Sequence, residues 1–158
     1  SKKIGIITFH SALNYGAVLQ TYALQTELEK LGCKAEVLDY SNPHAQLDVV
    51  ITGSDQVWND KITHNDDTFY LDVVSPHKRV SYAASIGSDE IPQESVRRIY
   101  PILKDFRAIS VRETQAQRAL LHQLGLEVQR VLDPTLLLCE EDYKGFITAP
   151  KAERFVLV

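Results

Sequence analysis

The sequence predicts an α/β protein with a Rossmann-like, doubly wound and mostly parallel sheet. Two observations predict this fold. Short apolar runs, typical of buried parallel strands, alternate with segments of helical period. Polar or glycine-containing motifs then follow five of the predicted strands, at the edge of the sheet where ligands bind in this fold class. At 158 residues the chain has the length of one domain.

The first part of the chain predicts a β-α-β unit. Residues 3–9 form an almost continuous apolar run, as expected for a strand that is buried on both faces. A helix is predicted over residues 16–31, because apolar residues recur near a 3.6-residue period and Gly32 follows as a stop. Residues 35–40 form the second strand, and the right-handed crossover makes the two strands parallel.

The rest of the chain continues the alternation of strands and helices. Strands are predicted at residues 47–52, 79–84, 108–111 and 128–132, and helices at residues 92–103, 113–124 and 140–147. Pro92 suits the first turn of its helix, and Gly125 closes the next one. The connection from Tyr40 to Leu47 is too short for a parallel crossover, which needs about a dozen residues or more. Either an antiparallel excursion occurs there or residues are absent from the sequence as given, and we favour absence.

Residues 1–148 are predicted to form an N-terminal Rossmann-like domain. Residues 149–153 resemble a linker, and residues 154–158 resemble the opening of a further strand. The chain also starts with Ser1 and contains no methionine. We therefore expect residues 149–158 to be a linker and the first strand of a missing C-terminal domain.

Composition and charge exclude several classes of function. The chain is 44% hydrophobic and 24% charged, and its net charge of −4 argues against a non-specific nucleic-acid surface. No apolar run reaches the about 18 residues that a membrane helix needs, and no signal-peptide pattern opens the chain. Cys33 and Cys139 have no metal-binding spacing, and we interpret them as reduced core residues of a cytosolic protein.

The segment after the first strand is a candidate anion site. Asn14, Tyr15 and Gly16 open the first helix, where backbone N–H groups and the helix dipole favour a negative charge. Asn14 would also cap this helix, and a capped turn without function explains the motif equally well. His10 is either an edge residue of the site or part of a polar turn. The motif is not GxGxxG, so the dinucleotide fingerprint is absent.

Gly53, Ser54, Asp55 and Gln56 follow the third predicted strand. The Asp55 carboxylate could orient sugar hydroxyls or act as a general base, since it accepts hydrogen bonds from OH groups. A tight turn capped by Asp55 is the alternative interpretation. Trp58, the single tryptophan, is expected in the core rather than stacked on a sugar.

Ser110 and Glu113 have the spacing of a capping box. Arg112 then lies in the first turn of a helix, where a cation is not favoured, and this placement points to contact with a carboxylate or phosphate ligand. Residues 64–67, with Asp72, are interpreted as a solvated loop rather than a metal site. The remaining histidines look like surface residues: His44, His77 and His122.

Five motifs together resemble the polysaccharide pyruvyl transferase family. They are residues 4–9 with 14–24, residues 53–59, residues 82–87, residues 110–113 and residues 132–135, in the family's order. The resemblance implies a glycosyltransferase-B-like architecture of two Rossmann-like domains with the active site between them. This chain would be the N-terminal half.

The resemblance implies transfer of the enolpyruvyl group of phosphoenolpyruvate to a sugar of a cell-surface polysaccharide precursor. The product is a pyruvate ketal, and phosphate is released. Phosphoenolpyruvate is the donor substrate, the partner is a sugar or lipid-linked oligosaccharide acceptor, and neither a cofactor nor nucleic acid is expected. The resemblance implies a cytoplasmic location, at the inner face of the bacterial membrane, and allows peripheral association of the protein with that membrane.

The candidate catalytic residues are Asp55 and Arg112. The candidate substrate-binding residues are His10, Asn14, Tyr15, Gly16, Gly53, Ser54, Gln56, Ser85, Gly87 and Arg112, and no metal ligand is expected. Arg112 matches the family's arginine and would contact the donor carboxylate or phosphate, while Ser54 and Asp55 would hold the acceptor. The family's other donor-binding basic residues and its histidine lie in the C-terminal domain, so this chain alone is expected to be inactive. The alternatives are a non-catalytic carbohydrate or nucleotide-sugar binding domain and a nucleotide-sugar glycosyltransferase.

Overall fold

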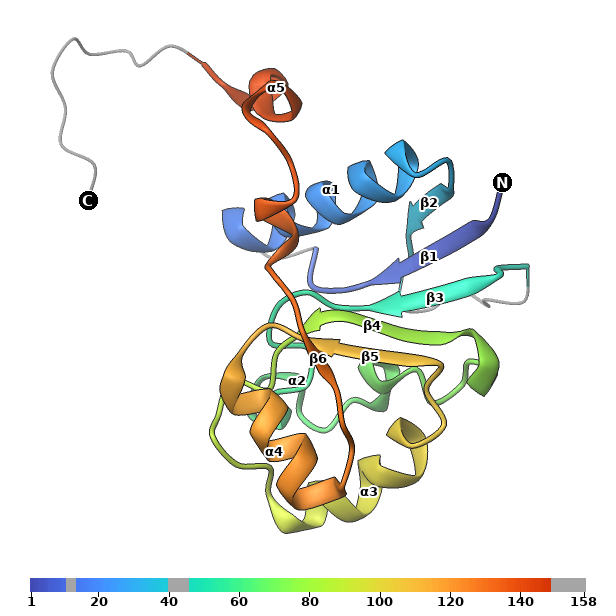
Figure 1. Cartoon of the computed structure of the whole chain (residues 1–158), viewed down its shortest axis with the longest axis vertical. Coiled ribbons are helices and arrows are strands. Elements are labelled where there is room, and N and C mark those ends of the chain that lie inside the picture. The colour runs from blue at the N-terminus through green and yellow to red at the C-terminus, as the bar shows by residue number, and fades with distance from the viewer. Residues whose placement is uncertain (11–13, 40–45, 149–158) are drawn as a thin grey trace, which may run out of the picture.

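A six-stranded parallel sheet forms the centre of the computed structural model, which describes residues 1–10, 14–39 and 46–148 (Figure 1). The strands are β1 (Lys3–Ile7), β2 (Lys34–Val37), β3 (Val49–Thr52), β4 (Arg79–Ala84), β5 (Ala108–Val111) and β6 (Gln129–Arg130). Their order across the sheet is β2-β1-β3-β4-β5-β6, and each adjacent pair is parallel. The predicted α/β class is therefore confirmed.

The direction of the strand order reverses at β1. From β1 the chain goes to β2 on one side, and β3 to β6 then follow on the other side. The carboxyl ends of β1 and β3 thus form a topological switch point, where open α/β sheets bind ligands. β3 pairs with β1 in parallel, so the strand predicted at residues 47–52 joins the sheet parallel to its neighbour. Residues 40–45 themselves lie outside the described part of the chain.

Helices cover both faces of the sheet (Figure 1). On one face lies α1 (Tyr15–Lys30), and the other face carries α2 (Asp60–Thr63), α3 (Gln93–Leu103) and α4 (Thr114–Leu124). The apolar side chains form two clusters, as a sheet buried on both faces requires. The smaller cluster, under α1, contains Ile4, Ile6, Leu24 and Ile51, and the larger one contains Ile7, Val50, Trp58, Leu103 and Leu120.

Local signals set the start of α1 and the end of α4. The Asn14 side chain caps α1 by accepting a hydrogen bond from the Ala17 N–H at 3.2 Å, as predicted. Gly125, with φ of +70°, closes α4 in the left-handed region, where glycine carries no Cβ penalty. Both predicted helices are therefore confirmed, with ends shifted by a residue.

The capping box predicted at the start of α4 is wrong. Ser110 still belongs to β5, and its hydroxyl bonds across to β4, accepting from the Ala83 N–H and donating to the Ser81 carbonyl. Glu113 is the residue before α4, but its carboxylate makes no cap bond to the helix. The spacing fits a capping box, but the hydroxyl was already used by the neighbouring strand.

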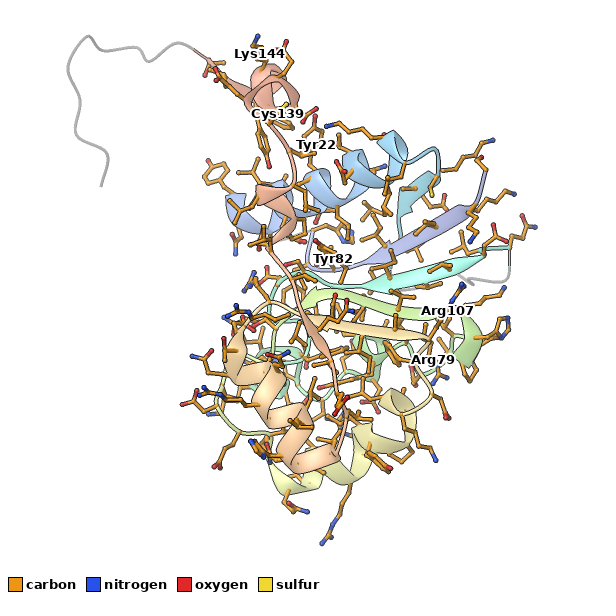
Figure 2. The ribbon with its side chains drawn as sticks, viewed as in Figure 1. Tyr22, Arg79, Tyr82, Arg107, Cys139 and Lys144 are labelled. Atoms are coloured by element: carbon orange, nitrogen blue, oxygen red, sulfur yellow. The ribbon has the colours of Figure 1, made fainter. Side chains whose placement is uncertain are left out.

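Trp58 lies in the core, as predicted. Its Nε1 donates to the Phe69 carbonyl at 2.9 Å, and its ring stacks on Tyr70 with the centroids 5.6 Å apart. The prediction that the cysteines are core residues is wrong for Cys139, which is exposed at the start of a short helix (Figure 2). Cys33 is half-buried and packs against the smaller apolar cluster.

After β6 the chain crosses to the face covered by α1. A single 3₁₀ turn, η3 (Pro134–Leu136), packs against α1, and α5 (Glu140–Tyr143) and η4 (Lys144–Phe146) follow it. The helix predicted over residues 140–147 is thus two short pieces. The predicted linker and strand at residues 149–158 lie outside the described residues. In the part of the chain that the structure describes, no helix combines the length and apolar character that crossing a membrane requires.

Candidate functional site

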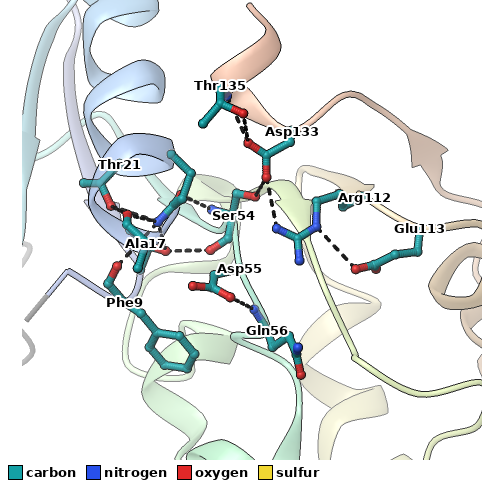
Figure 3. Close-up of polar contacts among 12 residues, drawn as sticks. Phe9, Ala17, Thr21, Ser54, Asp55, Gln56, Arg112, Glu113, Asp133 and Thr135 are labelled. Atoms are coloured by element: carbon teal, nitrogen blue, oxygen red, sulfur yellow. Dashed lines mark hydrogen bonds and ion pairs between the residues drawn. The ribbon is translucent and has the colours of Figure 1, made fainter. Parts of the chain in front are cut away.

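A cavity of about 210 Å³ opens at the carboxyl edge of the sheet, beside the switch point. It is lined by Asn14, Gly16, Ala17, Gln20, Asp55, Arg112, Asp133 and Thr135. These residues come from the start of α1 and from the segments after β3, β5 and β6 (Figure 3). Parallel strands place their carboxyl ends at one edge, and this is why residues more than 100 positions apart line one cavity.

The buried amide of Gln20 ties the start of α1 to the ends of β1 and β3. Its Nε2 donates to the Thr8 hydroxyl at 3.0 Å and to the Ala17 carbonyl at 2.8 Å. Its Oε1 accepts from the Ser54 N–H at 3.0 Å, and the Thr8 hydroxyl donates to the Ser54 carbonyl at 2.6 Å. Thr8 and Ser54 are fully buried, so these bonds satisfy polar groups that water does not reach.

The segment after β3 needs glycine at position 53. Gly53 has φ of +123°, and a Cβ there would collide with the Tyr82 carbonyl oxygen of β4. The Gly53–Ser54 peptide bond is cis, and Asp55 has φ of +87°. Asp55, two residues after Gly53, lines the cavity.

Asp55 is half-buried and holds one carboxylate oxygen in its own turn. Its Oδ1 accepts a hydrogen bond from the Gln56 N–H at 2.8 Å, so one of the two carboxylate oxygens caps the turn, as the alternative interpretation predicted. Among the residues described, none donates a hydrogen bond to Asp55 Oδ2. That oxygen is available to accept a hydrogen bond from a ligand hydroxyl.

Arg112 stands at the end of β5, just before α4, and not in the first helical turn as predicted. Its Nη1 donates to Asp133 Oδ2 at 3.0 Å, and its Nε donates to Glu113 Oε1 at 3.3 Å. Burial would lower the pKa of Arg112, but the hydrogen bonds to Asp133 and Glu113 outweigh it and the pKa is raised. Arg112 therefore carries a fixed positive charge at the cavity wall.

Asp133 holds four hydrogen bonds. Its Oδ1 accepts from the Thr135 N–H at 3.0 Å and from the Thr135 hydroxyl at 2.7 Å. Its Oδ2 accepts from Arg112 and from the Ser54 hydroxyl at 3.3 Å. Burial would raise the pKa of Asp133, but the bonds from Thr135 and Arg112 outweigh burial and lower it.

The cavity contains three polar residues that were not among the candidate site residues. Asp133 and Thr135 had a signal, because their motif follows the last predicted strand. Gln20 had none, since an amide inside a predicted helix resembles a surface residue until the fold shows it buried.

The other candidate residues are not among those that line the cavity. His10 Nδ1 lies 2.9 Å from the Thr8 carbonyl oxygen, and Tyr15 is 90% exposed. The Gln56 amide oxygen accepts from the Asn59 side chain at 2.7 Å, and Gly87, with φ of +69°, lies directly against both side chains. Ser85 is fully buried, and its hydroxyl has no partner among the described residues. Their roles in substrate binding stay predictions.

Asp67, in the acidic run of residues 64–67, forms an ion pair with Arg98 of α3, which also donates to Asp60 of α2 at 2.6 Å. These ion pairs join α2 and the following 3₁₀ turn, η1 (Asp67–Tyr70), to α3. The described ranges contain no group of three or more His, Cys, Asp or Glu side chains arranged to hold a metal ion. His77 and His122 are exposed, as expected, and His44 lies outside the described residues.

The fold and the cavity define a parallel α/β domain with a polar, charged cavity at its switch point. A family model described as polysaccharide pyruvyl transferase matches residues 14–157, which is most of the chain. The chain belongs to the polysaccharide pyruvyl transferase family, a family of transferases. Neither the curated proteins nor the solved structures contain a match to this sequence.

Proposed function

We propose that this chain forms part of an enzyme that transfers the enolpyruvyl group of phosphoenolpyruvate to a sugar and forms a pyruvate ketal. One observation carries the proposal: the Arg112 guanidinium and the Asp55 carboxylate line the same 210 Å³ cavity at the switch point. The reaction requires a cation for the anionic donor and a base for the acceptor hydroxyl, and this cavity offers one of each.

In the proposed mechanism Arg112 binds the donor. Nη2 of Arg112 has no partner in the described residues, so it is available to donate to the carboxylate or phosphate of phosphoenolpyruvate. The N-terminal end of α1, at Asn14 and Gly16, adds favourable backbone dipoles on the same cavity wall. Protonation of the methylene carbon then leaves a cationic centre at C2.

Asp55 serves the acceptor in this mechanism. Its free Oδ2 accepts the proton of a sugar hydroxyl as the hydroxyl oxygen attacks C2. A second sugar hydroxyl then attacks C2 and displaces phosphate, which leaves with the proton of that hydroxyl, and the ketal closes. The proton on the methylene carbon comes from an acid outside the described cavity. On the family resemblance, we propose that this acid and further donor-binding cations belong to a C-terminal domain, and that the chain alone is inactive.

The proposed acceptor is a sugar of a cell-surface polysaccharide precursor, free or lipid-linked. The proposed location is the cytoplasm, with peripheral association with the inner face of the membrane. No cofactor and no nucleic acid enter the proposal. Nothing in the cavity selects one sugar, so the acceptor is assigned only by class.

Calorimetry of phosphoenolpyruvate binding to the complete protein that contains this chain tests the proposal. A hydrogen bond to a charged group contributes about 1.5–3 kcal/mol, so Arg112→Ala should weaken binding about 10- to 150-fold. Arg118→Ala, which removes an exposed arginine of α4, is the matched control and should bind normally. Phosphate release should also require an acceptor sugar.

Two outcomes would overturn the proposal. Full activity of Arg112→Ala would remove the assigned role of that residue. Binding of a nucleoside diphosphate but not of phosphoenolpyruvate would favour a nucleotide-sugar glycosyltransferase instead.

A further inference from the structure

We propose that Asp133 and Glu113 form a carboxylate clamp, defined as these two side chains, that orients Arg112 and lowers its affinity for free anions. The clamp would make the site select the donor over inorganic phosphate. This inference rests on the proposed function for its catalytic part. Asp133 and Glu113 are positioning residues here, because they act through Arg112.

The clamp holds two of the three guanidinium nitrogens. Asp133 Oδ2 lies 3.0 Å from Nη1, and Glu113 Oε1 lies 3.3 Å from Nε (Figure 3). The two carboxylates come from different segments, one after β6 and one before α4. Because the guanidinium is planar and rigid, holding two nitrogens fixes the direction of the third. That nitrogen, Nη2, is the one with no partner in the described part of the chain.

Asp133 is itself held firmly. Thr135 donates to it twice and Ser54 donates once, and the Thr135 carbonyl accepts from the Tyr143 hydroxyl at 2.7 Å. A carboxylate has about four acceptor sites, and all are used here. Asp133 therefore has no free acceptor site for a substrate proton, and the function left to it is to position Arg112.

Glu113 has no competing structural use. Its side chain makes no cap bond to α4, and within the described residues its carboxylate accepts one hydrogen bond, from Arg112 Nε at 3.3 Å. Its other oxygen, Oε2, is buried and has no partner among the described residues. A buried carboxylate beside a guanidinium is explained by the charge that it faces.

The charges of Arg112 and the clamp predict a low affinity for free anions. Arg112 and the two clamp carboxylates sum to −1, so the cluster attracts anions less than a lone arginine does. What remains is a directed hydrogen bond from Nη2. A ligand binds if one of its acceptor oxygens lies along the Nη2 N–H direction and if it makes further contacts. Free phosphate gains little binding free energy from this one hydrogen bond.

Asp133→Asn in the complete protein tests the clamp. Asparagine keeps an acceptor for Thr135 but places a donor against Arg112 Nη1, so the guanidinium loses its fixed direction. A misplacement of about 1 Å can lower the rate by about 100-fold, and we expect kcat to fall at least about tenfold. The Kd for inorganic phosphate, measured by calorimetry, should fall at least about threefold because a negative charge is removed.

Two comparison variants make the result decisive. Asp142→Asn is the control. It removes the ion pair between Asp142 of α5 and Lys30 of α1, and it should change neither kcat nor the phosphate Kd. Glu113→Gln should shift both values in the direction of Asp133→Asn, and it decides the question if Asp133→Asn does not fold. A general loss of structure would raise the phosphate Kd instead of lowering it.

The clamp is overturned by an unchanged kcat in a folded variant, by a phosphate Kd that is raised in both Asp133→Asn and Glu113→Gln, or by no phosphate binding to the unmodified protein and to both variants. Failure of the proposed function looks different. In that case the unmodified protein transfers no pyruvyl group, yet the phosphate Kd values of the two proteins still decide the affinity part of the inference.

Discussion

Replacing Gln20 by leucine should destabilise the protein by leaving one buried donor without a partner. Gln20 is 2% exposed and accepts from the Ser54 N–H, which is fully buried. Leucine is close to glutamine in size but accepts no hydrogen bond. The other partners of Gln20 keep alternatives, since the Thr8 hydroxyl still donates to the Ser54 carbonyl and the Thr21 hydroxyl to the Ala17 carbonyl. The cost therefore centres on one N–H group.

The magnitude follows from that single orphaned donor. An unsatisfied buried hydrogen-bonding group costs about 1–3 kcal/mol, and we take about 2 kcal/mol as the expected loss in the free energy of unfolding. For a chain of this length, each kcal/mol lowers Tm by about 2–4 °C, so the midpoint should fall by about 4–8 °C. The same substitution at Gln25 is a matched control on the same helix. Gln25 is half-buried and donates to the Ala35 carbonyl, so its loss should cost less than about 1 kcal/mol.

Unfolding in urea measures both variants. Trp58 is the single tryptophan and lies in the core, so its fluorescence reports global unfolding. Gln20→Leu should lower the midpoint at an unchanged slope. Equal stability of Gln20→Leu and the unmodified chain, or an equal loss in Gln25→Leu, would refute the assignment of Gln20 as the link between α1, β1 and β3.

Two further predictions concern the same edge of the sheet. Gly53→Ala should cost more than about 2 kcal/mol, because its Cβ would meet the Tyr82 carbonyl at a φ that alanine does not adopt; Gly145→Ala, where a Cβ meets nothing within 4 Å, should stay within about 0.5 kcal/mol in thermal unfolding. The folded pKa of Asp133 is lowered from 3.8, so its stabilising charge is fully present above that pH and is lost as the pH falls through the folded value. Asp133→Asn should therefore reduce the fall of the urea midpoint as the pH is lowered, and an unchanged fall would contradict the hydrogen bonds that Thr135 and Arg112 donate to Asp133.

Local signals were sufficient for most of the fold. An apolar run marked β1, and Asn14 and Gly32 marked the ends of α1. Gly125 marked the end of α4 in the same way. These features act within a few residues, through backbone conformation or side-chain capping, and can therefore be predicted from neighbouring residues.

The capping box shows where local reasoning failed. Ser110 and Glu113 have the spacing of a helix start, but the Ser110 hydroxyl bonds to Ser81 and Ala83 of the adjacent strand. A hydroxyl has few hydrogen bonds to give, and the sheet used them first. Spacing alone does not show which partner a side chain meets.

The sequence by itself determined the α/β class, the positions of the strands and of α1, α3 and α4, the family resemblance and the edge of the sheet at which ligands should bind. Only the tertiary structure showed that Gln20 is buried beneath Ser54, and that Asp133 and Arg112, 21 positions apart, share a hydrogen bond. The reason is physical. Strand and helix preferences depend on neighbours along the chain, whereas a site depends on which carboxyl ends the strand order places side by side.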